Sequence, residues 1–179
     1  MTGRSARQKM NKNPLLKKII VAINGSESSV QAAMYAVMLA KQYSLALRAV
    51  YVVDTATIKF LTSSKFLVSE EKDSYETDLR RDGKTYLEYV KNLAKSKGME
   101  IETELREGSV WAEIIKAADD FSADMILLGG HETKDKLKMI ESQPHRSAAA
   151  TARSEIVNYA HCPVLVIHKP QIEALFKIF

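Results

Sequence analysis

Two short glycine-containing turns hold the residue types that could bind an anion. Asn24-Gly25-Ser26 follows the apolar run from Ile19 to Ile23, and Gly129-Gly130-His131 follows the run from Met125 to Leu128. An apolar run that ends at glycine predicts a buried strand and then a turn. Where such a turn leads directly into a helix, free backbone N–H groups suit a phosphate or a nucleotide. The alternative is a plain strand-to-helix connection without a ligand.

The first turn is followed by a helix signal. Ser28 with Gln31 three residues on has the capping-box pattern, which predicts a helix from Ser28 to about Tyr43. Its methionines and small apolar residues recur at helical spacing, which is typical of core packing.

Strands and helices alternate along the rest of the chain. Apolar and β-rich runs predict strands at 18–24, 45–53, 101–105, 125–128 and 164–168. Helices are predicted at 70–97, from Ser109 onward and at 153–159. Trp111, in the first turn of the second of these, is interpreted as a packing anchor. Five such alternations predict one α/β domain with a parallel, doubly wound sheet, whose ligands bind beyond the carboxyl ends of the strands.

One long connection does not fit this alternation. Residues 54–69 are predicted to be irregular, and their apolar side chains, including Phe60, Leu61, Phe66 and Leu67, indicate that they pack on something. The stretch is a lid, a partner surface or a satellite of the core.

Composition limits the classes of protein. The 179 residues, 46% hydrophobic, suffice for one globular domain. Residues 1–18 hold six lysines and arginines and no acid, which gives this segment a charge of +6. Because the whole chain has a net charge of +4, residues 19–179 carry a net charge of −2. We therefore expect a basic disordered leader at 1–16, the domain at 17–169 and an amphipathic tail at 170–179. Nucleic-acid binding is not expected from a leader of this kind.

Several other classes of protein are excluded by what the sequence lacks. No run approaches a membrane span and no secretory signal is present, and Cys162 is the single cysteine, so a cytoplasmic protein without a disulfide is expected. The four histidines do not fall at metal-ligand spacing, so no metal site is predicted.

Four segments resemble the universal stress protein family. They are KKIIVAINGSESS, YVVD, GSVWAEIIKAADDFSADMILLGGH and CPVLVIHKP, and the similarity runs from about Lys17 to Lys169. The resemblance implies the Rossmann-like, adenine nucleotide alpha hydrolase-like fold with strand order 3-2-1-4-5. In that order both glycine turns face one crevice. It also implies homodimers joined through the last strand.

The family includes proteins that bind ATP or another adenine nucleotide and proteins that do not. When the family pattern is placed on this sequence, Val52 takes the position of the valine that contacts adenine. Asn24 stands where the family has an aspartate after the first strand, and Gly129 takes the position of the first phosphate-loop glycine. The second glycine position holds Glu132, and the last Gly-Ser pair falls on Ala150-Thr151. Glycine lets backbone approach phosphate closely, and a carboxylate repels phosphate, so these departures weaken the nucleotide site.

Other residues of the longer loop could replace what is lost. Lys134, Lys136 and Lys138 supply positive charge, and Arg146-Ser147 could take the phosphate role. A charged, solvated loop is the alternative. The resulting candidate nucleotide-binding set is Asn24, Gly25, Ser26, Val52, Gly129, Gly130, His131, Arg146, Ser147 and Thr151.

The sequence leads to three functional hypotheses. The first is a non-enzymatic regulatory protein with a degenerate nucleotide crevice. The second is a binder of ATP or AMP with Mg, and a slow ATPase switch is one form of this hypothesis. The third is a hydrolase or transferase, for which His131 is the single acid–base candidate and no nucleophile or Walker motif exists, so no catalytic residue is predicted. A protein partner could also dock on Ile172 to Phe179 or Phe60 to Leu67.

Overall fold

A computed structural model describes residues 14–64, 69–130, 148–168 and 171–179 of the chain. Its strands are β1 (Lys18–Ile23), β2 (Ala46–Val53), β3 (Glu102–Glu107), β4 (Met125–Gly129) and β5 (Val164–Ile167). All pairings are parallel, in the order β3-β2-β1-β4-β5. The predicted fold class and strand order are therefore confirmed.

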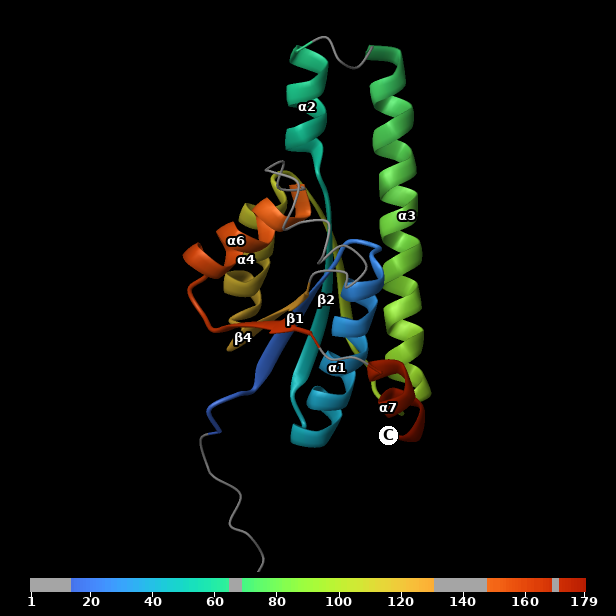
Figure 1. Cartoon of the computed structure of the whole chain (residues 1–179), viewed down its shortest axis with the longest axis vertical. Helices are drawn as coiled ribbons and strands as arrows, with labels where there is room; N and C mark the ends of the chain where they lie inside the picture. Colours follow the sequence, from blue (N-terminus) through green and yellow to red (C-terminus); the bar gives the residue numbers. More distant parts are fainter. Residues whose placement is uncertain (1–13, 65–68, 131–147, 169–170) are drawn as a thin grey trace, which may run out of the picture.

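Helices cover both faces of the sheet (Figure 1). The helices α1 (Glu27–Tyr43), α3 (Ser69–Ser96) and α7 (Ile172–Ile178) pack together on one face, and α4 (Val110–Phe121) and α6 (Ala148–Tyr159) pack on the other. Apolar side chains on each face form a separate core, because parallel strands between two helix layers are buried on both sides. None of the described helices has the length and apolar character needed to cross a bilayer.

The connection after β2 was predicted to be irregular, but most of its described part is helical. It forms α2 (Thr55–Ser63), which stands beside α3 beyond the end of the sheet (Figure 1). Asp54 is its N-cap, since the Asp54 side chain accepts a 2.9 Å hydrogen bond from the Thr57 N–H. Ile58 is buried at 2% exposure, whereas Phe60 is 68% exposed. Phe66 and Leu67 lie outside the described residues.

Several element boundaries also differ from the prediction by one or more residues, and three of these differences have a local physical reason. The N-cap of α1 is Ser26 rather than Ser28, because the Ser26 side chain accepts from the Ser29 N–H at 3.2 Å. β1 ends at Ile23, one residue early, because Asn24 begins the turn. α6 begins at Ala148 rather than at Arg153, since alanine has the highest helix propensity.

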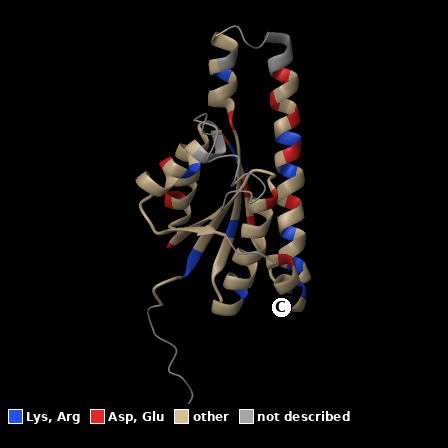
Figure 2. Ribbon diagram, viewed as in Figure 1, with Lys and Arg blue, Asp and Glu red and all other residues tan. Residues whose placement is uncertain are grey.

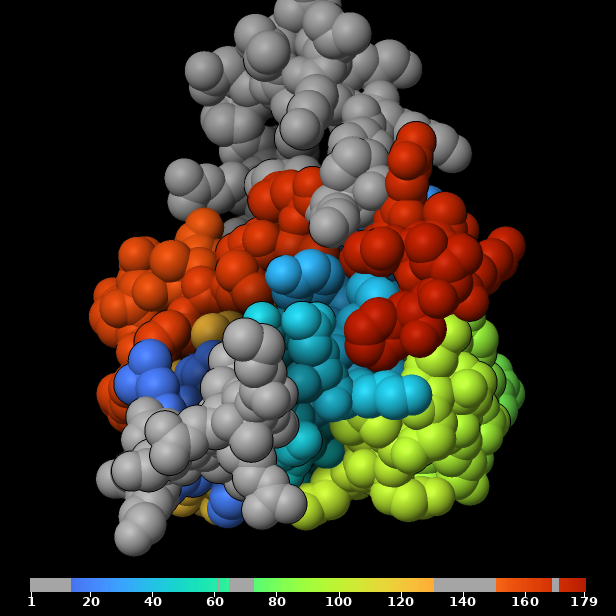
Figure 3. Space-filling model, turned by 90° about the horizontal axis from the view of Figure 1, so that it is seen from below, coloured from blue at the N-terminus to red at the C-terminus, as the bar shows by residue number. Residues whose placement is uncertain are grey.

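The predicted amphipathic tail is helical and packs on its own chain. Seen from below, α7 (red) lies against the ends of α1 and α3 (Figure 3). Ile172 and Phe176 are buried in the core of that face, and the Lys97 ammonium lies 4.6 Å from the centre of the Phe176 ring. Ile178 remains 84% exposed. The apolar face of the tail is thus largely covered within the chain.

Charged side chains concentrate on α3 (Figure 2). Arg80 of α3 donates to both carboxylate oxygens of Glu107 at 2.6 and 2.9 Å, which ties the helix to the edge strand β3. Gly83 of the same helix is buried, and a Cβ there would lie 2.6 Å from the Tyr51 ring. The lack of a side chain at Gly83 lets α3 approach β2 next to the crevice described below.

Candidate functional site

Two adjoining cavities open at the carboxyl ends of β1, β2 and β4. The smaller has a volume of about 100 Å³ and the larger about 530 Å³. Both are lined by Asn24, Tyr51, Val52, Val110 and Ala152, so we treat them as one crevice. The strand order reverses between β1 and β4, which is where ligands bind in open α/β sheets.

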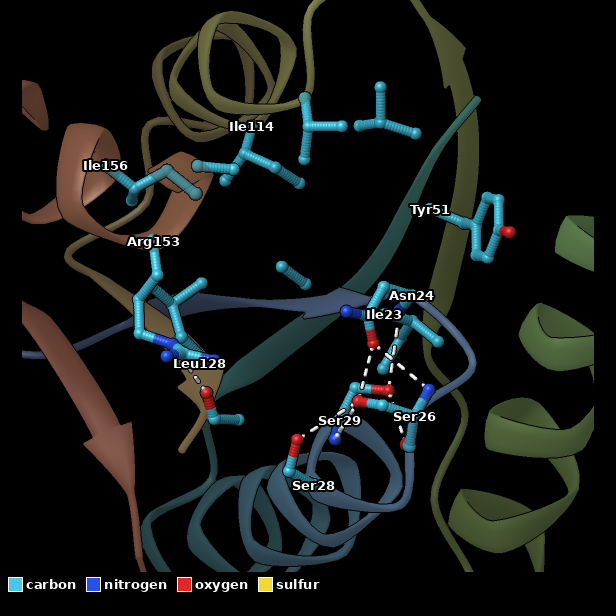
Figure 4. Close-up of a pocket in the computed structure, with 15 residues that line it drawn as sticks. Ile23, Asn24, Ser26, Ser28, Ser29, Tyr51, Ile114, Leu128, Arg153 and Ile156 are labelled. Carbon is cyan, nitrogen blue, oxygen red and sulfur yellow. Dashed lines mark hydrogen bonds between the residues drawn. The ribbon is translucent and has the colours of Figure 1, made fainter. Parts of the chain in front are cut away.

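The turn after β1 is held by a compact hydrogen-bond network (Figure 4). The Asn24 side-chain oxygen accepts from the Ser26 N–H at 3.1 Å and from the Ser26 hydroxyl at 2.7 Å. The Ser29 hydroxyl donates to the Ser26 carbonyl at 2.8 Å. Because the Asn24 oxygen is engaged within the turn, the polar group that Asn24 can offer a ligand is its NH₂ donor.

Gly25 fits this turn for a conformational and a steric reason. Its φ of 82° lies in the left-handed region, where glycine is favoured. A Cβ at Gly25 would also lie 2.6 Å from the ring of Tyr86. Tyr86 stacks on Tyr51 with centroids 6.4 Å apart and planes inclined by 6°. Tyr86 of α3, which lines neither cavity, therefore packs against the first turn from outside the crevice.

Gly129 permits the close approach of β4 to α1. A Cβ at Gly129 would lie 2.5 Å from the backbone carbon of Ser28 and 2.7 Å from the backbone nitrogen of Ser29. Gly130, the next residue, donates its N–H to the Ile167 carbonyl at 2.9 Å and lies against the His168 ring. The two glycines set how near the second turn comes to the start of α1.

Arg153 is a crevice residue that was predicted only as the start of a helix. Its Nε donates to the Gly129 carbonyl at 3.0 Å and its Nη2 to the Gly130 carbonyl at 3.2 Å. Burial lowers the pKa of the guanidinium. Among the described residues that line the smaller cavity, Arg153 alone carries a charge. The sequence clue was its place two residues after Thr151 at a predicted strand-end crevice.

The larger cavity is mainly apolar and aromatic. Tyr75 and Leu79 of α3 and Trp111 of α4 line it together with Val52. Trp111 also packs against Tyr159 of α6, with ring centroids 6.0 Å apart. Trp111 is thus a packing residue, as predicted, and in addition part of the cavity wall. Burial also raises the pKa of the Tyr51 phenol between the two cavities, with the nearby Asp82 carboxylate as a further cause.

The structure brings most of the described candidate residues together. Asn24, Ser26, Val52 and Gly129 line the smaller cavity, and Thr151 lines the larger one with Asn24 and Val52. Gly25 and Gly130 belong to the adjoining turns. His131, Arg146 and Ser147 lie outside the described residues, as do Glu132 and the three loop lysines.

The side chains in the described walls of the two cavities favour the binding of a ligand. One cation faces the smaller cavity, whereas ring and aliphatic side chains dominate the larger one. Within the described parts of the chain, no three histidines, cysteines or carboxylates gather as a metal site would require. An anionic ligand with a ring system matches these walls. Fold and crevice together define a doubly wound α/β protein with a crevice at its topological switch point.

The chain belongs to the universal stress protein family, whose model matches residues 16–168. The universal stress protein MJ0531 of Methanocaldococcus jannaschii is 33% identical over 165 residues, covering 91% of this chain and 88% of that protein. The fold is similar to that of an Arabidopsis thaliana family member solved with AMP bound, with a TM-score of 0.60, 16% identity and coverage of 88% and 94%. It is also similar to a universal stress protein in complex with cAMP, with a TM-score of 0.55, 16% identity and coverage of 86% and 97%.

Proposed function

We propose that this chain is a regulatory protein that binds an adenine mononucleotide in the crevice. The observation that carries the proposal is the pair of joined cavities at the switch point, one with a cation and the other with aromatic walls. Family members of the same fold are known with AMP and with cAMP. In this proposal the nucleotide is a signal and not a substrate.

The phosphate is placed in the smaller cavity. Arg153 supplies positive charge there, and charge-assisted hydrogen bonds are the strong ones. Asn24, whose side-chain oxygen is engaged by Ser26, lines the same cavity and can offer its NH₂ donor. Gly129 lines this cavity and permits the close approach of β4 to the start of α1. These groups supply part of what the sequence departures at Glu132 and Ala150 remove.

A second candidate is a regulatory protein whose crevice has lost nucleotide binding. The observation that favours it is the engagement of the Asn24 oxygen by Ser26, since that oxygen is then a poor acceptor for a ribose hydroxyl. In this case the protein acts through its surfaces rather than through a bound nucleotide.

Isothermal titration of the full chain separates the two candidates. We expect AMP or cAMP to bind with one site per chain, and ATP to be titrated with and without Mg²⁺. Val52→Phe fills the wall shared by both cavities and should abolish binding, whereas Val157→Phe, on an exposed part of α6, should not. Absence of heat with all three nucleotides at millimolar concentration favours the degenerate crevice.

We also propose a homodimer through β5, which lies at the edge of the sheet. The hydrogen bonds from Ile126 to the Pro163 carbonyl and from Gly130 to the Ile167 carbonyl imply that the Val166 N–H points away from β4. Val166→Pro then removes an outward donor at little cost to the monomer. A dimer that becomes a monomer by light scattering supports pairing at this edge, and an unchanged dimer contradicts it.

A further inference from the structure

The two cavities of the crevice carry charges of opposite sign. Arg153 lines the smaller cavity, and Asp54 is the charged residue among the described walls of the larger one. Asp54 does not line the smaller cavity, and Arg153 does not line the larger one. A ligand that extends through both would therefore meet a cation near one end and a carboxylate near the other.

The Asp54 carboxylate retains capacity to accept hydrogen bonds. One oxygen accepts from the Thr57 N–H at 2.9 Å and the other from the Thr57 hydroxyl at 2.6 Å. Each carboxylate oxygen has two acceptor sites, so each can take a second donor. These bonds also hold the carboxylate at the first turn of α2, which fixes its position at the cavity wall.

The walls around Asp54 suit a flat heterocycle. Trp111 and Tyr75 offer ring surfaces, and Leu79 and Val52 offer aliphatic contacts. Aromatic side chains stack on bases without distinguishing among them. Apolar walls alone would thus bind several bases with similar strength, whereas a hydrogen-bond acceptor in the wall, such as the half-buried Asp54, can discriminate by whether the base carries a donor.

We propose that Asp54 is a specificity-determining residue that selects a base carrying an exocyclic amine. The amine donates to the carboxylate in the larger cavity while the phosphate lies toward Arg153. This assignment rests on the proposed function, because it concerns the same crevice. It adds the N-cap residue of α2, a helix that the sequence did not predict.

The test compares AMP with purine riboside 5′-monophosphate, which has the same ring system without the amine. Both are titrated into the full chain by calorimetry. We expect AMP to bind about tenfold more tightly or better, as a hydrogen bond to a charged group allows. Asp54→Ser and Asp54→Asn both keep an N-cap side chain for α2 but remove the carboxylate. Asp54→Ser should lower the AMP preference to about twofold or less, and Asp54→Asn, which keeps a neutral amide acceptor, should leave a preference between that of Asp54→Ser and that of the unaltered chain.

Purine riboside 5′-monophosphate is also the folding control, because its affinity should not change in either variant. Asp119→Asn, on α4 and outside both cavities, should keep the full AMP preference. If neither nucleotide binds the unaltered chain, the proposed function fails and this inference with it. If both bind equally, the inference alone fails. A preference that survives in Asp54→Ser, or loss of both nucleotides in both variants, also overturns the role of Asp54.

Discussion

Replacing Gly129 by alanine should destabilise the protein and weaken nucleotide binding together. The added Cβ would lie 2.5 Å from the Ser28 backbone carbon, 2.6 Å from its oxygen and 2.7 Å from the Ser29 nitrogen. Carbon contacts are optimal at about 3.5–4.0 Å, so β4 and α1 must separate by up to about 1 Å. Overpacking of this kind costs about 1–3 kcal/mol, and the stiffer unfolded chain returns about 0.4–1 kcal/mol.

The central values of these ranges, about 2 and about 0.7 kcal/mol, give a net loss of about 1.3 kcal/mol, which corresponds to a fall in Tm of roughly 3–5 °C for a chain of this size. Urea unfolding followed by circular dichroism measures the stability, and titration with AMP measures the affinity. Gly98→Ala is the matched control, since nothing lies within 4 Å of its Cβ and its φ of 71° alone imposes a cost. That cost is about 1–2 kcal/mol, without an effect on AMP affinity. If Gly129→Ala loses less than about 0.5 kcal/mol of stability and keeps its AMP affinity, the close approach of β4 to α1 limits neither the stability nor nucleotide binding.

Three further outcomes are expected. Two backbone N–H groups at the start of β1 donate to Asp124 and hold the pKa of its carboxyl below the ordinary 3.8. The stabilisation by this carboxylate is therefore present above pH 3.8 and is lost as the pH falls through the lower pKa of the folded state. Asp124→Asn should flatten this part of the acid unfolding curve. Ile172→Ala, at a fully buried position of α7, should cost about 2–5 kcal/mol in urea unfolding, whereas Ile178→Ala should stay within about 0.5 kcal/mol. Arg153→Gln should weaken AMP roughly tenfold by calorimetry and leave adenosine unchanged, and equal losses for both would contradict a phosphate contact.

The order of the elements was predictable because apolar runs and glycine turns mark strands directly. The helix α2 was missed for a physical reason. Threonine and isoleucine are poor helix formers, so Thr55, Thr57 and Ile58 weigh against a helix by propensity. The Asp54 cap and the burial of Ile58 outweigh that preference. A cap is visible in sequence only once a helix is suspected.

The site residues that follow strand ends could be predicted from the sequence, whereas those placed by contacts between distant segments could not. Asn24, Val52 and Gly129 were found because turns after parallel strands meet at one edge of the sheet. Arg153 was missed because its contact with the Gly129 carbonyl spans 24 residues and depends on how α6 packs. Gly83 gave no signal, since its close neighbour Tyr51 is known only from packing.

The most direct test of the central claim is an NMR titration of isotopically labelled full-length protein with AMP. Nucleotide binding in the crevice predicts that the amide signals that shift include those of residues 24–29, 51–54, 109–111, 128–130 and 151–153, which surround the crevice. Signals of α7, which lies against the far ends of α1 and α3, should not move. Shifts confined to α7 or to β3, or no shifts at millimolar AMP, would contradict nucleotide binding at this crevice.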